Sequence, residues 1–270
     1  MSGHTKPIIQ LIIGAHRSGT SVTTQVLSVL GYDLGRTLML PAFDNPRGFW
    51  ENSKIVEAHD RLLQALGVDW TTAAMLPKNW HTTQAARIAI DELAEVLAED
   101  FDKTSNKLIK DPRLALLFPI WPKIAKKSGH DLHVVSALRR PSSVINSVAK
   151  RNDFSQADSE LIVSSQVSIM GGVLNSYSPP VAIFEKLTTL SAAEIVRELK
   201  KALPHLNIKA SKPMINMINR IVSERMSDGT EKDQDYDAIV LQNKSKLFVD
   251  WTIARTYICL LYTSPSPRDS

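Results

Sequence analysis

The chain has 270 residues, of which 43% are hydrophobic and 22% charged, enough for one α/β domain with a sizeable buried core. Its net charge of +4 is mild and no dense run of Lys and Arg occurs, so nucleic acid is not an expected partner. The single cysteine, Cys259, excludes an intramolecular disulfide framework, and no apolar run approaches the roughly 20 residues that span a bilayer. Residues 1–7 (MSGHTKP) lack the apolar core of a signal peptide, so we expect a cytoplasmic protein.

The first predicted elements are a strand, a glycine-bounded loop and a helix, all within residues 8–30. Residues 8–13 (IIQLII) are largely apolar and rich in β-branched side chains, as in a parallel strand covered on both faces. Gly14 and Gly19 bracket the loop, and apolar residues then follow at helical spacing up to Gly31. Glycines let backbone N–H groups converge and a helix N-terminus carries about half a positive charge, so this segment is predicted to bind phosphate.

The loop has the spacing of the nucleotide-binding motif G-x-x-x-x-G-K-[ST], but Thr20 stands where that motif has lysine. In ATP-binding loops the lysine reaches the β- and γ-phosphates and the next hydroxyl holds magnesium. Here Arg17 supplies the cation from within the loop, which favours a different anion and no metal. The alternative is an ordinary strand–turn–helix with incidental glycines.

Strands and helices alternate along the chain as far as about residue 205. Helical patterns cover about residues 51–66, 83–101, 142–152, 157–177 (interrupted at Gly171-Gly172) and 191–203, with a helix beginning at Pro112 that is kinked or broken by Pro119 and Pro122. Strand patterns cover residues 107–110, 132–138 and 180–186. This alternation predicts an α/β fold of the P-loop type, with three α/β/α layers around a central parallel sheet.

The chain divides by composition near residue 226. Residues 1–226 carry the periodic pattern and form the predicted domain, whereas residues 227–270 are polar and are predicted to be a poorly ordered tail. The ending LLYTSPSPRDS resembles translated adapter or vector sequence, which would not be native, and the alternative is an ordinary disordered terminus.

Three cationic side chains follow the ends of predicted strands. Arg17 lies in the first loop, Lys110 ends the strand of residues 107–110, and Arg139 follows the strand of residues 132–138. Ligands of parallel sheets bind at the carboxyl edge of the strands, so these three cations are expected to converge on one ligand. Asp111, next to Lys110, is interpreted as a helix N-cap.

These motifs resemble those of the nucleotide-dependent sulfotransferases, P-loop enzymes that use 3′-phosphoadenosine 5′-phosphosulfate. The family's 5′-phosphosulfate loop, [KR]-S-G-T-[TS], corresponds to Arg17, Ser18, Gly19, Thr20 and Ser21. Its 3′-phosphate motif, R-x-P-x5-S, runs here from Arg139 to Ser147, and the sequence Lys110-Asp111-Pro112 recurs in protein-tyrosine and related bacterial members. The C-terminal R-K-G-x-x-G-D-W-K segment of cytosolic small-molecule sulfotransferases is absent, so the likeness is to the bacterial and tyrosyl-protein or carbohydrate branch.

The resemblance implies a sulfuryl transfer without a metal ion. Arg17 and Lys110 would neutralise the charge that builds on the leaving phosphate oxygen, and Ser18, Thr20 and Ser21 would bind the donor's oxygens. Arg139 and Ser147 would hold the 3′-phosphate, because an arginine fork with a hydroxyl suits a phosphate dianion.

A general base is also expected, and Glu51 beside Phe49 and Trp50 is the candidate, since desolvation raises the pKa of a carboxyl. Alternatively, Glu51 only complements the dipole of a helix that begins there. His59 and Asp60 are weaker candidates for the base, and His16 is interpreted as a packing or hydrogen-bonding histidine.

Two other functions stay open at this level. One is a P-loop kinase for a small metabolite, which Thr20 disfavours because it replaces the lysine, and the other is a non-catalytic nucleotide-binding module. The acceptor could be a saccharide, a lipid, a tyrosine or a small alcohol, because no motif identifies it. The oligomeric state is likewise not encoded in any recognisable pattern.

Overall fold

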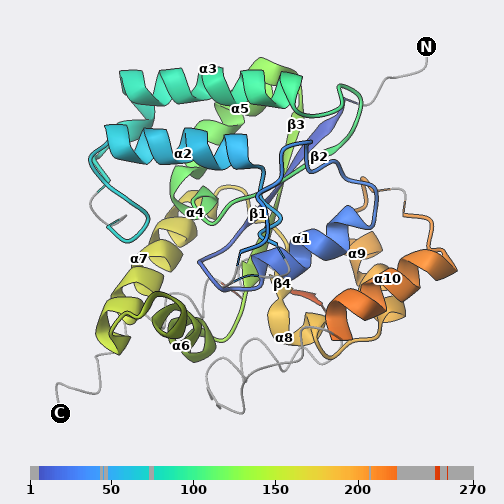
Figure 1. Ribbon diagram of the computed structural model, residues 1–270. Coiled ribbons are helices and arrows are strands. Elements are labelled where there is room, and N and C mark those ends of the chain that lie inside the picture. The colour runs from blue at the N-terminus through green and yellow to red at the C-terminus, as the bar shows by residue number, and fades with distance from the viewer. Residues whose placement is uncertain are drawn as a thin grey trace.

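The computed structural model is a three-layer α/β/α structure with a sheet at its centre (Figure 1). It describes residues 6–42, 45, 48–72, 76–206, 208–223, 247–249 and 254. The predicted fold class is confirmed. Most of the predicted tail, including Cys259, lies outside the described residues.

The sheet has five strands in the order β2-β1-β3-β4-β5, and the first four are parallel. The strands are β1 (Ile8–Ile13), β2 (Lys107–Lys110), β3 (Asp131–Leu138), β4 (Val181–Ile183) and β5 (Phe248–Val249). Strand β1 lies between β2 and β3, so the next two strands of the chain lie on opposite sides of it. In parallel sheets ligands bind where neighbouring strands connect in opposite directions, which here is the carboxyl end of β1.

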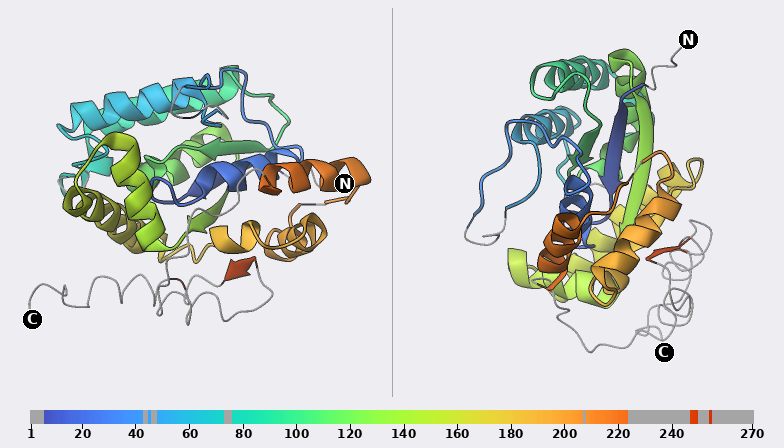
Figure 2. Two further views of the ribbon diagram at one scale, coloured as in Figure 1. Left: turned by 60° about the horizontal axis from the view of Figure 1, so that its bottom comes forward. Right: turned by 90° about the vertical axis from the view of Figure 1, so that its right-hand side faces the viewer.

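Helices cover both faces of the sheet (Figures 1 and 2). The α-helices are α1 (Thr20–Ser28), α2 (Ser53–Ala65), α3 (Gln84–Glu99), α4 (Leu114–Leu117), α5 (Trp121–Ser128), α6 (Pro141–Asn152), α7 (Gln156–Leu174), α8 (Phe184–Leu187), α9 (Ala192–Ala202) and α10 (Lys212–Ser223). Two 3₁₀ turns, Trp80–Thr82 and Phe118–Ile120, precede α3 and α5.

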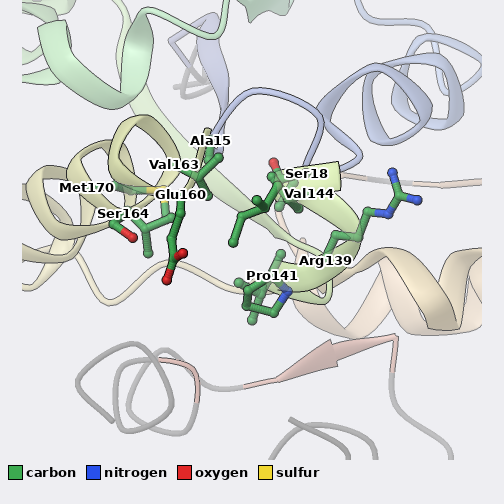
Figure 3. Close-up of a pocket in the computed structure, with 13 residues that line it drawn as sticks. Ala15, Ser18, Arg139, Pro141, Val144, Glu160, Val163, Ser164 and Met170 are labelled. Carbon is green, nitrogen blue, oxygen red and sulfur yellow. The ribbon is translucent and has the colours of Figure 1, made fainter. Parts of the chain in front are cut away.

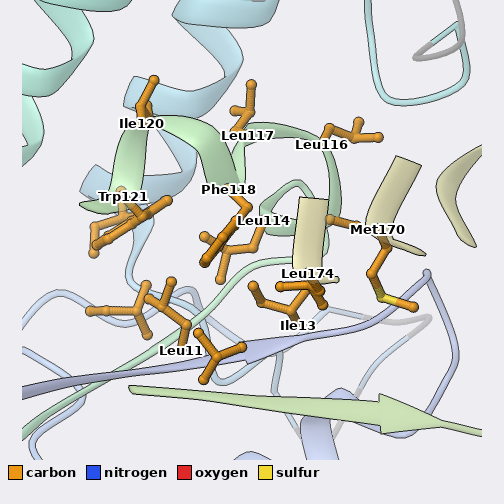
Figure 4. Close-up of a cluster of buried hydrophobic side chains, with 14 of the residues drawn as sticks. Leu11, Ile13, Leu114, Leu116, Leu117, Phe118, Ile120, Trp121, Met170 and Leu174 are labelled. Atoms are coloured by element: carbon orange, nitrogen blue, oxygen red, sulfur yellow. The ribbon is translucent and has the colours of Figure 1, made fainter. Parts of the chain in front are cut away.

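Alternate residues of β1 face the two apolar layers, as a strand's two-residue period requires. Leu11 and Ile13 pack on one side beneath α4, the turn before α5 and α7, where Phe118 and Trp121 are almost fully buried (Figure 4). Ile12 points to the other side, towards α1, α9 and α10. Because both faces are covered, all six residues of β1 are buried, which explains its nearly continuous apolar sequence.

Two predicted boundaries need correction. Helix α7 is not interrupted at Gly171-Gly172, because its packing against α4 and α6 offsets the cost of about 1 kcal/mol that each glycine adds to a helix. The predicted strand 180–186 ends at Ile183, and the chain turns into α8 at Phe184. Three residues are enough for β4 to pair with the end of β3, from Ser136 to Leu138.

The described part of the predicted tail belongs to the fold. Strand β5 pairs antiparallel with β4, and Leu247 and Ala254 are fully buried in the two apolar layers. Sequence periodicity does not reveal such a contribution, because an edge strand of two residues has no measurable period. Most of residues 227–270 lie outside the described residues, so the boundary near residue 226 stays a prediction.

Candidate functional site

The loop after β1 has a shape that only glycine allows at its two ends. A Cβ on Gly14 would lie 2.4 Å from Ser18 Oγ and 2.9 Å from the carbonyl oxygen of Ala137, closer than real Cβ contacts. Gly19 has φ 96°, and a Cβ there would meet the Phe184 ring at 2.7 Å. Arg17 also adopts a left-handed φ of 69°. The loop is thus tightly wrapped, with Arg17 at its apex.

The hydroxyls of this loop lie at the start of α1. Ser18 and Thr20 are buried, Ser21 is half-buried, and Gly19 provides no side-chain cap for the helix. Among the described residues, Ser18 Oγ has no hydrogen-bond partner although it is buried. A buried hydroxyl without a partner is uncommon, and together with uncapped N–H groups it is suited to an anion.

The predicted 5′ and 3′ anion groups come together across the carboxyl ends of β1 and β3. Arg17 Nε donates to Ser147 Oγ at 2.8 Å, although the two residues are 130 positions apart. Arg139 Nη1 donates to the Arg17 carbonyl oxygen at 3.4 Å, and its guanidinium lies 4.6 Å from the centre of the Phe184 ring. Two arginines and a serine therefore form one cluster above the loop.

Lys110 and Glu51 form a buried ion pair at the end of β2. Lys110 Nζ bonds to Glu51 Oε1 and to the carbonyl oxygen of Phe49 at 3.1 Å, and the two charged side chains are only 4% and 6% exposed. Lys110 pairs with Ile12 in the sheet register, so it lies next to the start of the loop. Burial raises the pKa of the Glu51 carboxyl, and the charge of Lys110 opposes that rise.

Glu51 is held in place before α2, and not in its first turn. Helix α2 begins at Ser53 with Asn52 as its N-cap, so Glu51 does not complement the dipole from within the helix as the alternative interpretation required. The Asn52 amide donates to Asp100 at 2.6 Å, and the Met39 N–H donates to the Glu51 carbonyl oxygen at 2.8 Å. These bonds fix the backbone that presents the Glu51 carboxyl to Lys110.

Asp111 is not the N-cap that the sequence suggested. Helix α4 starts later, at Leu114, with Arg113 at its N-cap position, because the segment 112–113 forms a turn first. Asp111 is instead fully buried, and its Oδ2 accepts a hydrogen bond from His59 Nδ1 at 2.7 Å. Asp60 binds Arg113 at the surface. The two weaker candidates for the base, His59 and Asp60, are therefore bonded to Asp111 and Arg113, respectively.

His16 packs as the sequence suggested. Its ring stacks on Trp70 with 4.3 Å between centroids, and the main-chain N–H of His16 donates to Gln166 Oε1 at 3.1 Å. Burial lowers the pKa of His16 to about 3, so its imidazole is neutral at physiological pH. The sequence analysis did not single out Phe184, Trp70 or Gln166, because their contacts with the loop join segments that are distant in the chain.

A cavity of about 90 Å³ lies next to the loop, between the end of β3 and helices α6 and α7 (Figure 3). Glu160 and Ser164 approach it from α7, and Ser18 and Arg139 border it on the loop side. The remaining lining residues are apolar, namely Ala15, Ala137, Leu138, Pro141, Val144, Ile145, Val163, Val167 and Met170. Ser18 of the loop and Arg139 therefore border a small cavity whose other lining is largely apolar.

The described residues contain no group of three or more His, Cys, Asp or Glu side chains placed to hold a metal ion. None of the described helices combines the length and apolarity that crossing a membrane requires.

No family model matches the chain, and no curated protein matches it. The structure is similar to the sulfotransferase domain of the olefin synthase from Synechococcus PCC 7002, with 17% sequence identity and a TM-score of 0.44. The match covers 98% of this chain and 91% of that domain.

Proposed function

We propose that this protein is a sulfotransferase that moves a sulfuryl group from 3′-phosphoadenosine 5′-phosphosulfate to a hydroxyl or amine of an acceptor. The observation that carries the proposal is the contact between Arg17 and Ser147, reinforced by Arg139 on the Arg17 carbonyl. It joins two sequence motifs, one suited to each end of a bisphosphorylated nucleotide, at one edge of the sheet. A donor with a single phosphate group would need only one of them.

The loop residues are suited to the 5′ end of this donor. The uncapped N-terminus of α1, the buried Ser18 hydroxyl and the Arg17 guanidinium can each bind an oxygen of a phosphosulfate. Thr20 and Ser21 add two more hydroxyls at the same helix end. Gly14 and Gly19 leave the backbone close enough for its N–H groups to take part.

Arg139 and Ser147 are suited to the 3′-phosphate. Arg139 is supported by the Phe184 ring beneath it, which favours one orientation of its planar guanidinium. Ser147 projects from α6, and its hydroxyl accepts the Arg17 Nε–H. A phosphate dianion would find a fork and a hydroxyl there.

Glu51 and Lys110 supply the acid–base part of the proposed reaction. The acceptor oxygen or nitrogen attacks sulfur, the bond from sulfur to the phosphate oxygen breaks, and the acceptor's proton passes to the Glu51 carboxylate. Lys110 can donate to the leaving oxygen, whose negative charge grows as that bond breaks. Because Lys110 and Glu51 are bonded to each other, the proposed proton donor and the proposed base lie side by side.

Of the two rival functions, the kinase is disfavoured by the loop itself. Thr20 stands at the position of the phosphate-binding lysine, and Arg17 is turned towards Ser147. A non-catalytic nucleotide-binding module would need only the two anion groups. The buried Glu51–Lys110 pair, whose assembly costs desolvation, is what favours an enzyme over such a module.

We expect transfer of radiolabelled sulfate from the nucleotide donor without any divalent metal. The test is product formation against a panel of saccharides, lipids, tyrosine peptides and small alcohols, with and without EDTA. Turnover that EDTA abolishes and magnesium restores would contradict the proposal, and binding of the nucleotide without transfer to any acceptor would favour the non-catalytic module.

Adenosine 3′,5′-bisphosphate is expected to bind at least about tenfold more tightly than 5′-AMP, a difference of about 1.4 kcal/mol, because only the bisphosphate engages both anion groups. Arg139→Ala should remove most of that difference, as measured by calorimetry with both nucleotides. Arg197→Ala, a change of an exposed arginine on α9, serves as the charge-matched control. Equal affinities in the wild-type protein would show that there is no 3′-phosphate site.

A further inference from the structure

A second buried pair, which has no part in the proposed reaction, includes the residue that follows Lys110 in the chain. His59, from the middle of α2, and Asp111, which follows β2, are both 0% exposed in their side chains. His59 Nδ1 and Asp111 Oδ2 are 2.7 Å apart. Burying two such groups is costly, and a hydrophobic pair would serve packing as well or better.

Asp111 is fixed from a second direction by Arg113. Its Oδ1 accepts the Arg113 N–H at 2.9 Å and Arg113 Nη1 at 3.0 Å, and Arg113 Nη2 in turn donates to Asp60 at 2.9 Å. Burial alone would raise the pKa of Asp111, but the hydrogen bond from His59 and the nearby positive charge outweigh it and hold the pKa below its ordinary value. Asp111 is therefore a permanent carboxylate with a rigid orientation.

This carboxylate is adjacent in the chain to Lys110. Lys110 is the last residue of β2, where its pairing with Ile12 fixes the main chain before it leaves the sheet, and the anchored Asp111 fixes the main chain directly after it. The groups that act electrostatically on Glu51 are Lys110, Asp111 and Arg113. Of these, only Asp111 carries a negative charge, and it acts against ionisation of Glu51, as a neighbouring like charge does.

We propose that His59 and Asp111 are positioning residues for the Lys110–Glu51 pair: His59 locks the Asp111 carboxylate, and Asp111 anchors the main chain from which Lys110 reaches Glu51. The hydrogen bond between His59 and Asp111 is separate from those that join Arg17, Ser147 and Arg139. The influence of the pair is therefore directed at the acid–base groups. The inference rests on the proposed function for the role of Glu51 as the base.

The kinetic test compares two substitutions of one residue. His59→Leu removes the donor to Asp111, whereas His59→Asn places an amide N–H close to the position of Nδ1. We expect kcat to fall about tenfold or more in His59→Leu, with the affinity for adenosine 3′,5′-bisphosphate unchanged, and to recover largely in His59→Asn. Glu57→Gln, a change of an exposed residue on the same helix, is the control. Equal losses in both His59 variants, in proportion to their loss of thermal stability, would show a purely structural staple.

A titration that needs no turnover tests the charge effect. The Glu51 carboxyl is followed by carbon NMR against pH, assigned by its absence in Glu51→Gln. In Asp111→Asn its titration should move to lower pH, because the like charge has been removed and Arg113 remains. An unmoved titration would show that the Asp111 charge does not act on Glu51. If Asp111→Asn does not fold, the same titration in His59→Leu and His59→Asn decides, since only the former disturbs the Asp111 carboxylate.

The two hypotheses can fail separately. If wild-type protein transfers no sulfate to any acceptor, the proposed function is wrong, yet the titration of Glu51 still reports whether His59 and Asp111 control that carboxyl. If transfer occurs and the titration is insensitive to both residues, the proposed function stands and this inference does not.

Discussion

Replacing Arg17 with alanine is expected to lower the rate of sulfuryl transfer by about 100-fold or more. This is the scale for removing one donor that stabilises charge in a transition state, and Arg17 is the cation at the apex of the loop. Its guanidinium also bonds Ser147, so the substitution separates the two anion groups. Single-turnover measurements with saturating donor give the rate of the chemical step directly.

Two further variants make this result interpretable. Arg36→Ala removes an arginine that bonds the Glu99 carbonyl oxygen, on another part of the surface, and should leave the rate unchanged. Arg17→Lys keeps the charge but lacks the guanidinium fork, so an intermediate rate is expected. If Arg17→Ala weakens donor binding but leaves the single-turnover rate intact, Arg17 contributes to binding and not to the chemical step.

Lys110→Ala is expected to have two effects of different origin. The rate should fall about 100-fold, because a donor to the leaving oxygen is lost. The free energy of unfolding should also fall by about 3–5 kcal/mol, because the substitution leaves the buried Glu51 carboxylate without its partner. Denaturant unfolding measures the second effect independently of the first.

The double variant Lys110→Ala with Glu51→Gln separates these effects. It replaces the stranded charge with a neutral amide, so most of the lost stability should return while the rate stays low. A double variant that regains activity together with stability would show that the pair is only structural.

The pH dependence of kcat provides a related check on Glu51. Glu51 accepts a proton only as a carboxylate, and burial raises its pKa, so the rate should fall on acidification at a higher pH than for an ordinary glutamate. Glu51→Gln keeps the side-chain shape and should lose this acidic limb together with most of kcat. An acidic limb that persists in Glu51→Gln would assign it to a different group.

The sequence by itself determined the alternation of strands and helices, with a parallel sheet, and the candidates for the anion site. Strand β1 is apolar throughout because both its faces are covered, and Gly14 and Gly19 are required by local clashes and by a left-handed φ. These are short-range constraints, and they leave a pattern in neighbouring residues. The two motifs around Arg17 and Arg139 directly follow β1 and β3, which are parallel neighbours. Their placement at one edge of the sheet could therefore be predicted.

Only the tertiary structure decided which side chains meet. Arg17 contacts Ser147 across 130 positions, Lys110 contacts Glu51 across 59, and His59 contacts Asp111 across 52. Asp111 looked like a helix cap because a carboxylate before a proline has that local meaning, and its burial against α2 leaves no trace in the neighbouring sequence. Strand β5 was invisible for the same reason, since two residues gain their order from the edge of β4 alone. Contacts between distant segments depend on how helices pack on the sheet, and that packing is set by the whole core and not by any one stretch of chain.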